Sequence, residues 1–364
     1  MNNITFFVTV LDSGGLENYL LRFITHKNIG FDKIIVFCKG GKTGQLEQKF
    51  ISIPNVSIHS KKISFFNPLD YLYIYHFLNK HKINSVCDFT GNYAGLVLYT
   101  AKLAKVKKRI SFYRGSTNHF NESKLKLLYD KFVKKLTYKY ATNILSNSMA
   151  AFDFFFRDNW RENKRFSVIY NGIDSKSFIN EKNDLRDEFD IPKNAFVIGH
   201  TGRFNSAKNH KTILKVAFEL CKKNKDIYFL LCGNGVKDNL ETIVIENGLH
   251  NRIITLNNRE DIPKVLNTLD CFYFPSITEG QPNALLEAMI VGLPFIASNI
   301  DVIKETVPNE SYEFLVEPND VKGAVEKINL LISDVELRNK MNFSSWAKKK
   351  FDPDKLFNKF YQEL

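Results

Sequence analysis

Short apolar runs, rich in β-branched and aromatic residues, alternate along the chain with segments of helical periodicity. The runs form two series. The first comprises residues 4–10, 33–38, 85–89, 109–113 and 166–170, and the second comprises residues 196–202, 227–233, 253–256, 271–275 and 294–298. This alternation predicts βαβ units with parallel strands, and strands that are apolar throughout are typical of sheets covered on both faces. We therefore predict an α/β protein with two doubly wound domains.

A turn and a charged stretch separate the two series. The turn NGID occupies residues 171–174, and the charged stretch occupies residues 181–194. We expect an N-terminal domain over residues 1–176 and a C-terminal domain over residues 177–345. Residues 346–364 are rich in Phe and Tyr and predict a helix that packs back on the first domain. Ligands of doubly wound sheets bind beyond the carboxyl ends of the strands, and both sets of ends can face one cleft, so residues that follow strands are the candidates for chemistry.

Composition narrows the class of protein. The 364 residues are 44% hydrophobic and 25% charged, as expected for two globular domains of ordinary size. No apolar run has the length of a membrane span, and the N-terminal MNNITFFVTV is interpreted as a first strand rather than a signal peptide. The five cysteines are scattered and form no CxxC pair, which argues against a metal cluster or a disulfide framework and fits a reducing cytoplasm.

The net charge of +12 is unevenly distributed. Residues 1–176 carry +15 and residues 177–364 carry −3, and residues 101–140 alone carry +10. Positive charge concentrated in this way can attract an anionic partner. A solvated, lysine-rich surface is the alternative, and the sequence leaves both open.

Two glycines follow the first strand. Gly14 and Gly15 precede a helix that we expect to begin near Leu16. Backbone without Cβ atoms lets a ligand approach closely, and the free N–H groups of a helix start favour an anion such as phosphate. An ordinary tight turn would have the same sequence.

Two cations follow the strand at 196–202, in the stretch GRFNSAKNH. Arg203 and Lys208 can neutralise a diphosphate, the arginine as a fork and the lysine as a point charge. A solvated basic loop is the alternative for this pair.

The stretch TEGQPNALLEAM contains two glutamates seven residues apart. Glu279 follows a buried strand, so we expect it at the carboxyl end of the sheet. Glu287 belongs to a helix that we predict from Pro282 to Gly292 and that is otherwise largely apolar. A buried carboxylate requires hydrogen-bond donors, which the vicinal diol of a ribose would supply. A salt bridge for Glu287 and an exposed loop for Glu279 are the alternatives.

The wider stretch TEGQPNALLEAMIVGLPFIAS resembles the Glu-seven-Glu signature of retaining glycosyltransferases of the GT-B fold, family 4 type. Four further stretches agree with that family in order and spacing: SGGLENYL, YNGID, GRFNSAKNH and NNREDIPKVLNTLDCFYFPS. The resemblance covers the whole chain and is most specific over residues 196–300. It implies two Rossmann-like domains that face a central cleft.

The resemblance implies roles for individual residues. Glu287 would bind the ribose of a nucleotide-sugar donor, and Glu279 would position the hydroxyls of the transferred sugar rather than act as a nucleophile. Arg203 and Lys208 would hold the diphosphate and offset its growing charge. The catalytic set is therefore Glu279, Arg203 and Lys208. The expected donor-binding residues are Gly14, Gly15, Arg203, Lys208, Asn258, Arg259, Gly280, Gln281, Pro282, Asn283, Ala284 and Glu287.

One position departs from the family, and one motif is set aside. Where many relatives carry a histidine in the cleft, the strand RISFY runs into Arg114, with His119 five residues later. Either residue could contact the donor or the acceptor, or neither could, and both are kept as candidate acceptor or cleft residues. The DxD motif at Asp352–Pro353–Asp354 follows no strand and is interpreted as a helix start. We expect no metal and no cofactor.

The basic segment at 121–140 has apolar residues at steps of three and four. It predicts an amphipathic helix that lies on an anionic bilayer, or a core helix with a solvated lysine face. With the resemblance, this favours a cytoplasmic enzyme peripheral to the inner face of the plasma membrane. It would move a hexose or N-acetylhexosamine from a nucleotide-diphosphate sugar, UDP favoured, to a glycan or polyprenyl-diphosphate-linked acceptor in surface-polysaccharide synthesis.

Three alternatives explain part of the sequence. A sugar-nucleotide epimerase of the same fold would keep the base and diphosphate contacts and need no glycan acceptor. A non-catalytic nucleotide-sugar-binding protein would not need both glutamates together with Arg203 and Lys208. A nucleic-acid binder would leave the donor-site residues unexplained, so we expect no nucleic-acid partner.

Overall fold

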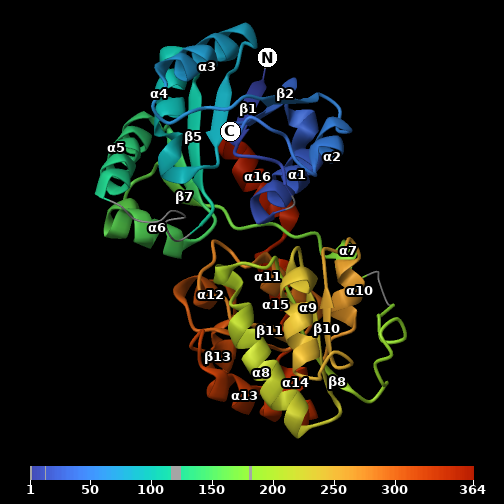
Figure 1. Ribbon diagram of the computed structural model, residues 1–364. Coiled ribbons are helices and arrows are strands. Elements are labelled where there is room, and N and C mark those ends of the chain that lie inside the picture. The colour runs from blue at the N-terminus through green and yellow to red at the C-terminus, as the bar shows by residue number, and fades with distance from the viewer. Residues whose placement is uncertain (1, 13, 116–123, 180–182) are drawn as a thin grey trace. The chain divides into compact units, whose positions relative to one another are not determined.

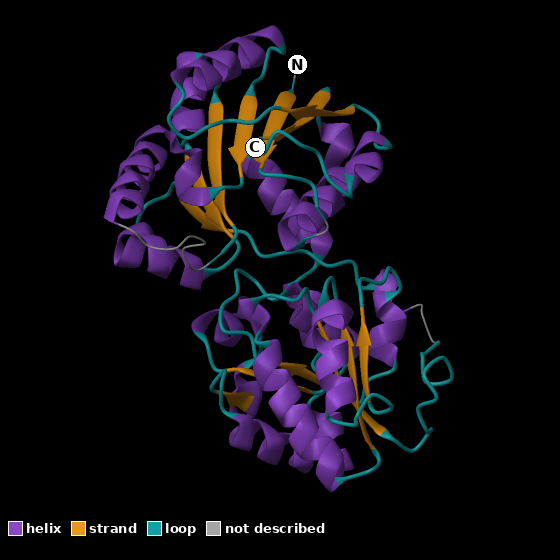
Figure 2. Cartoon of the chain, viewed as in Figure 1, coloured by secondary structure: helices purple, strands orange, loops and turns teal. Residues whose placement is uncertain are grey.

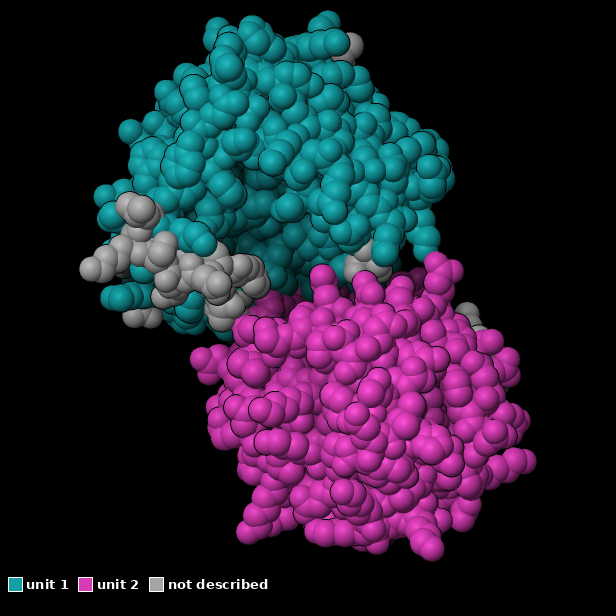
Figure 3. Space-filling model, in the orientation of Figure 1, with its two compact units in different colours: residues 1–172, 353–364 teal, residues 173–352 magenta. Residues whose placement is uncertain are grey.

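Two parallel β-sheets, each in a unit of its own, organise the chain in the computed structural model. The structure describes residues 2–12, 14–115, 124–179 and 183–364. The first unit comprises Met1–Gly172 and Pro353–Leu364, and the second comprises Ile173–Asp352 (Figure 3). Helices cover both faces of each sheet (Figure 2), so the predicted pair of doubly wound α/β domains is confirmed.

The sheet of the first unit has the strand order β3-β2-β1-β4-β5-β6-β7, and the pairs are parallel. Its strands are β1 (Asn3–Val8), β2 (Lys33–Cys38), β3 (Val56–Ser60), β4 (Ser85–Asp88), β5 (Lys108–Tyr113), β6 (Asn143–Ser146) and β7 (Phe166–Val168). Every residue of β1 is buried, because helices cover both faces of this central strand.

The helices of the first unit bury two apolar clusters, one on each face of the sheet. One cluster includes residues of α1 (Gly15–Lys27), α2 (Glu47–Ile51) and α16 (Pro353–Glu363). The other includes residues of α3 (Pro68–Lys80), α4 (Gly95–Leu103) and α6 (Met149–Phe156). Helix α5 (Lys124–Tyr140) packs on α4 (Figure 1).

The C-terminal helix belongs to the first unit, although it follows the second in sequence (Figure 1). Phe360 packs on Phe23 of α1 with 4.5 Å between ring centroids, and Ser85 Oγ donates to the Leu364 carbonyl at 2.6 Å. The expected helix at 346–364 is two helices. The first, α15 (Ser344–Lys350), stays in the second unit, where Ser344 Oγ donates to the Ile290 carbonyl at 2.5 Å. The helix breaks before Pro353 because proline lacks the N–H that a continuing helix needs.

The sheet of the second unit has the strand order β10-β9-β8-β11-β12-β13, again with parallel pairs. Its strands are β8 (Phe196–Thr201), β9 (Ile227–Cys232), β10 (Ile253–Leu256), β11 (Cys271–Phe274), β12 (Phe295–Ser298) and β13 (Leu315–Val316). Its helices are α7 (Lys176–Ile179), α8 (His210–Lys223), α9 (Val236–Glu246), α10 (Ile262–Asn267), α11 (Asn283–Val291), α12 (Asp301–Thr306), α13 (Val321–Ser333), α14 (Val335–Lys340) and α15.

Each sheet reverses its strand order beside its first strand. The reversal lies between β1 and β4 in the first unit and between β8 and β11 in the second. Doubly wound sheets bind their ligands beyond the carboxyl ends of the strands at such a switch point. In the second unit, Lys208 ends the 3₁₀ segment Ser206–Lys208 that follows β8, and Glu279 lies in the loop after β11, so both lie at the switch point. Among the described residues, no helix is both long and apolar enough to cross a membrane.

Candidate active site

An ion pair joins two predicted catalytic residues of the second unit. Lys208 Nζ donates to Glu279 Oε1 at 2.6 Å, across 71 positions of sequence. The two side chains are only 17% and 11% exposed, and the ammonium lies 4.7 Å from the centroid of the Phe274 ring. Charges this shielded from water interact more strongly than a surface pair. The pair therefore fixes a lysine and a carboxylate next to each other at the switch point.

Backbone and amide contacts hold these two loops together. The Ile277 amide donates to the Ala207 carbonyl at 2.8 Å. Asn209, in a left-handed conformation with φ of 57°, donates from Nδ2 to the carbonyls of Pro275 (3.1 Å) and Pro318 (2.7 Å). Asparagine is one of the few non-glycine residues that adopt this conformation readily. The sequence analysis missed Asn209, and the Asn beside the candidate Lys208 was the available signal.

Arg203 is exposed, and no described residue forms an ion pair or hydrogen bond with its guanidinium. The backbone around it is tightly packed. A Cβ on Gly233 would lie 2.1 Å from the Gly202 carbonyl oxygen, and one on Gly202 would lie 3.0 Å from His200 Nε2. Glycines at both positions let the loops after β8 and β9 approach closely and leave Arg203 available to a ligand.

Two buried histidines that the sequence analysis missed lie beneath Lys208. His200 and His210 are 0% and 2% exposed, and their rings meet edge to face. Burial lowers the pKa of His200 well below its ordinary value, and burial together with the charge of Lys208 lowers the pKa of His210 to about 4. Both rings are therefore neutral at pH 7 and add no positive charge beside Lys208.

Helix α11 begins after Pro282 and ends at Gly292, which has φ of 89°, so the helix predicted from Pro282 to Gly292 is confirmed. Most of its apolar residues are buried, whereas Glu287 is half-buried. Gln281 and Pro282 are buried, and Gly280 and Ala284 are half-buried. The amide of Asn283, an expected donor-binding residue, donates to the Gln281 carbonyl at 3.0 Å.

Arg259 is held by two carboxylates rather than free to meet a nucleotide base. Its Nε and Nη2 donate to Asp261 at 2.7 and 2.8 Å, and its Nη1 donates to Glu188 Oε1 at 2.7 Å. These bonds raise the pKa of Arg259 and lower that of Asp261. The neighbouring Asn258 is exposed. A donor contact in this segment thus falls more readily to Asn258 than to Arg259.

At the switch point of the first unit, Gly14 is the N-cap residue of α1, and a charged cluster lies at the carboxyl ends of β2 and β4. Lys39 Nζ donates to Asp88 Oδ2 at 2.7 Å and to Thr90 Oγ1 at 2.8 Å. Asp88 is fully buried. Lys39 and Asp88 were not predicted, although Lys39 directly follows the apolar run 33–38 and Asp88 is the charged residue of the run 85–89.

Arg114 follows β5 in the first unit, and its guanidinium stacks on the Tyr19 ring at 3.9 Å from the centroid. His119 lies outside the described residues. Asp354 is in the first turn of α16, as the helix-start interpretation of the DxD motif predicted, and pairs with His26 at 2.7 Å. Within the described ranges, no group of three or more His, Cys, Asp or Glu side chains is placed to hold a metal ion.

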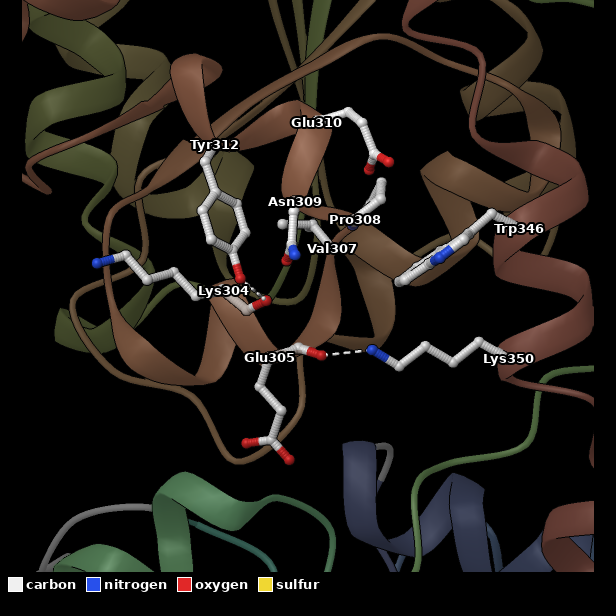
Figure 4. A pocket seen from close by; sticks show the side chains of 9 residues that line it. All are labelled: Lys304, Glu305, Val307, Pro308, Asn309, Glu310, Tyr312, Trp346 and Lys350. Carbon is white, nitrogen blue, oxygen red and sulfur yellow. Dashed lines mark hydrogen bonds between the residues drawn. The ribbon is translucent and has the colours of Figure 1, made fainter.

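A hollow of about 350 Å³ lies elsewhere on the second unit, between α12, α15 and the 3₁₀ segment Asn309–Phe314 (Figure 4). Trp346 forms one side, and Lys350 Nζ donates to the Glu305 carbonyl at 2.5 Å. Tyr312 donates to the Lys304 carbonyl at 3.0 Å. No predicted site residue lines this hollow.

Comparison with known proteins identifies the family. Residues 181–345 match the model of the family described as glycosyl transferases group 1. The chain is also 30% identical, over 281 residues, to the UDP-Gal:alpha-D-GlcNAc-diphosphoundecaprenol alpha-1,3-galactosyltransferase of Escherichia coli. That alignment covers 74% of this chain and 71% of the relative. The chain belongs to the group 1 glycosyl transferases. A glycosyltransferase activity is thereby favoured over the epimerase and the non-catalytic alternatives.

Further relatives of this glycosyltransferase serve bacterial glycan synthesis. The present chain is 24% identical to a Campylobacter jejuni enzyme, in an alignment that covers 98% of this chain and 97% of the relative. That enzyme is named N-acetylgalactosamine-N,N'-diacetylbacillosaminyl-diphospho-undecaprenol 4-alpha-N-acetylgalactosaminyltransferase. Among solved structures, Anabaena Alr3699/HepE in complex with UDP superposes with a TM-score of 0.82 at 20% identity, covering 100% of this chain and 99% of that one. The glycosyltransferase thus shares the GT-B fold.

Proposed function

We propose that this glycosyltransferase retains the anomeric configuration of the sugar, requires no metal, and moves a hexose or N-acetylhexosamine from a UDP-sugar to a lipid-linked glycan. The names of the Escherichia coli and Campylobacter jejuni relatives support a diphospho-undecaprenol type of acceptor. The UDP in the Anabaena structure supports the nucleotide. Polysaccharide synthesis is the setting in which such relatives work.

The Lys208–Glu279 ion pair at the switch point is the observation that carries this proposal. As the sugar leaves, negative charge grows on the diphosphate, and fixed cations placed where that charge develops lower the barrier. Lys208 is such a cation, and the exposed Arg203 is the second. These two side chains would supply the charge that a divalent metal supplies elsewhere, which is why we propose metal independence.

Glu279 would position the transferred sugar. Its Oε1 accepts from Lys208 Nζ, and the oxygens of a carboxylate can also accept hydrogen bonds from sugar hydroxyls. A carboxylate held by an ammonium at 2.6 Å is also a weakened nucleophile. We therefore propose that the acceptor attacks on the face from which the diphosphate leaves, without a sugar-enzyme intermediate. Glu287 would bind the ribose.

A lysine and aromatic surface on the first unit supports docking on an anionic membrane. Its apolar members are exposed: Phe65 (53%), Phe66 (78%), Leu69 (69%), Leu72 (51%), Leu128 (63%) and Phe132 (51%). Tyr129 of α5 connects the exposed residues at 65–72 with those of α5, because its ring centroid lies 5.8 Å from that of Phe65 and 4.7 Å from that of Phe66. Exposed lysines surround them on α5: Lys126, Lys131, Lys135 and Lys139.

The sequence left open whether the apolar stripe of helix α5 faces a bilayer or the core. Leu128 and Phe132 are exposed, whereas Val133 and Thr137 are buried among the described residues of α5. The apolar side chains that project outward therefore lie among lysines, as in helices that bind anionic bilayers. We propose that this surface holds the enzyme on the inner face of the plasma membrane, near a lipid-linked acceptor.

Calorimetric titration with UDP and GDP, each with and without EDTA, tests the donor site. We expect UDP binding that EDTA does not change and that Glu287→Ala weakens. Transfer of labelled sugar to a lipid-linked acceptor, with NMR assignment of the product anomer, tests the reaction. An inverted product, or transfer abolished by EDTA, would contradict the retaining, metal-independent mechanism.

Sedimentation with phosphatidylglycerol vesicles tests the membrane surface. The double variant Phe66→Ser, Leu69→Ser should lose binding. The matched control is Leu330→Ser, Val335→Ser, which changes two equally apolar residues of the second unit that are 51% and 58% exposed. Equal sedimentation of both variants would mean that another surface, or none, meets the membrane.

A further inference from the structure

The Arg114 guanidinium forms no ion pair or hydrogen bond through its buried Nε and Nη1 with a described residue. The guanidinium lies against aromatic rings, with Cζ 3.9 Å from the Tyr19 centroid and 5.0 Å from the Phe112 centroid. Stacking on ring faces recovers part of the lost hydration, but it leaves the N–H donors unused. Proteins rarely shield a charge in this way without a partner.

Neighbouring positions carry further unused polar atoms. Asn147 is 2% exposed and its Oδ1 lacks a described partner, and the same holds for the hydroxyl of Tyr19, which is 1% exposed. Tyr113 and Ser146 pair in register between β5 and β6, so Arg114 and Asn147 both lie one residue beyond the last pair. The carboxyl ends of these two strands therefore present unused donors beside an unused acceptor.

At the end of β4, which pairs with β5, the buried polar group has its hydrogen-bond partners. Both oxygens of Asp88 have described partners: Oδ1 accepts from Thr90 at 2.9 and 2.6 Å, and Oδ2 accepts from Lys39 at 2.7 Å. The buried charge of Asp88 is thus satisfied within the unit, whereas the unused atoms at Arg114 and Asn147 would be satisfied by a ligand.

We propose that Arg114 binds an oxyanion, either phosphate or carboxylate, carried by the sugar acceptor, and that Asn147 Oδ1 accepts from an acceptor hydroxyl. A guanidinium fork matches two oxygens of such a group. The ligand would be a hydroxylated oxyanion, which describes both a glycosyl diphosphate and an acidic sugar. This inference rests on the proposed function for the presence of a sugar acceptor.

The charge of Arg114 is permanent at neutral pH. Burial lowers its pKa to about 10, while Glu17 and Tyr19 of α1 favour the charged form and Arg22 opposes it. A histidine in this place would titrate near neutrality. The arginine therefore supplies a full positive charge where the resemblance to the family predicts a histidine.

Thermal unfolding of the first unit, with UDP present at saturation to fill the donor site, tests the proposal. In a Trp346→Phe background the remaining Trp160 lies in the first unit and reports its unfolding. Inorganic pyrophosphate and glucuronate are the probes, and they separate a diphosphate from a carboxylate. The variants are Arg114→Met and Arg114→Lys, with Arg161→Ala as the matched control, since Arg161 is an exposed arginine of the same unit, 48% accessible.

We expect one of the two probes to raise the unfolding temperature of the wild type and of Arg161→Ala by about 5 °C at a hundredfold excess over Kd. The unfolding temperature of Arg114→Met should rise by less than about 1 °C when a probe is added. Without a probe, this variant should unfold at or above the wild-type temperature, because an apolar side chain replaces an unpaired ion. Arg114→Lys should keep a partial response. A response to neither probe, or an equal response of wild type and Arg114→Met, would overturn the proposal.

Failure of this inference can be distinguished from failure of the proposed function. If UDP does not bind to the wild type in the calorimetric titration, the proposed function fails before the Arg114 question arises. If UDP binds and the probes shift the wild type and Arg114→Met equally, the inference about the acceptor fails alone.

Discussion

Removing one partner of the Lys208–Glu279 pair should affect both stability and turnover. The two side chains are 17% and 11% exposed and lie 2.6 Å apart. Loss of one partner from a fully buried pair costs about 3–5 kcal/mol, because a shielded charge is left uncompensated. Partial solvent access here reduces that cost to about 1–3 kcal/mol for Lys208→Met or Glu279→Gln. The double variant should be less destabilised than the sum of the single variants.

Urea unfolding and transfer kinetics measure the two effects separately. In a Trp160→Phe background, Trp346 of α15 reports unfolding of the second unit. The control is the exposed pair Lys223–Glu219, at 2.8 Å with side chains 68% and 38% exposed, for which a few tenths of a kcal/mol are expected. In the transfer assay, loss of a cation that stabilises the leaving diphosphate should lower kcat about 100- to 1,000-fold in Lys208→Met.

Two results would refute this reasoning. Additive destabilisation in the double variant, with no coupling beyond that of Lys223–Glu219, would mean that the pair is a surface contact. Wild-type kcat in Lys208→Met or Glu279→Gln would mean that the pair lies outside the site, whatever its effect on stability.

The remaining predictions concern single residues of the second unit. Glu287→Ala should weaken UDP binding at least about tenfold in calorimetry, as loss of a charged hydrogen bond does, and unchanged affinity would remove Glu287 from the site. His210 has a pKa of about 4 in the folded state, below its unfolded value. The unfolded state therefore binds more protons between pH 6.5 and pH 4, and stability should fall by about 3 kcal/mol as pH drops through that window. His210→Gln should flatten this part of the urea-unfolding profile, and an unchanged profile would contradict the assignment. Asn209→Ala should lower kcat and cost about 2 kcal/mol, because it removes two hydrogen bonds between the loops and strains a left-handed residue. Asn209→Gly should relieve the backbone strain but should not restore the two hydrogen bonds. Wild-type kcat in Asn209→Gly would therefore show that these hydrogen bonds are dispensable.

Several elements follow from local pattern alone, because they depend on periodicity and on the conformational limits of single residues. Apolar runs marked the strands of both sheets, and Pro282 and Gly292 marked the ends of α11. Strands β3, β6 and β13 were not predicted, since Val56–Ser60 mixes polar with apolar residues, Asn143–Ser146 is only four residues long and Leu315–Val316 is only two. The motif spacing also selected the positions of Arg203, Lys208, Glu279 and Glu287.

Tertiary structure decided which of these residues meet. Lys208 and Glu279 pair because β8 and β11 are neighbours in the sheet, and strand order is a property of the whole domain rather than of either loop. The same global packing brings Glu188, 71 positions away, to Arg259, and it places Arg114 on the Tyr19 ring without an ion pair to a described residue. Sequence periodicity determined the elements and their order, whereas contacts between distant segments depend on how the sheets are wound.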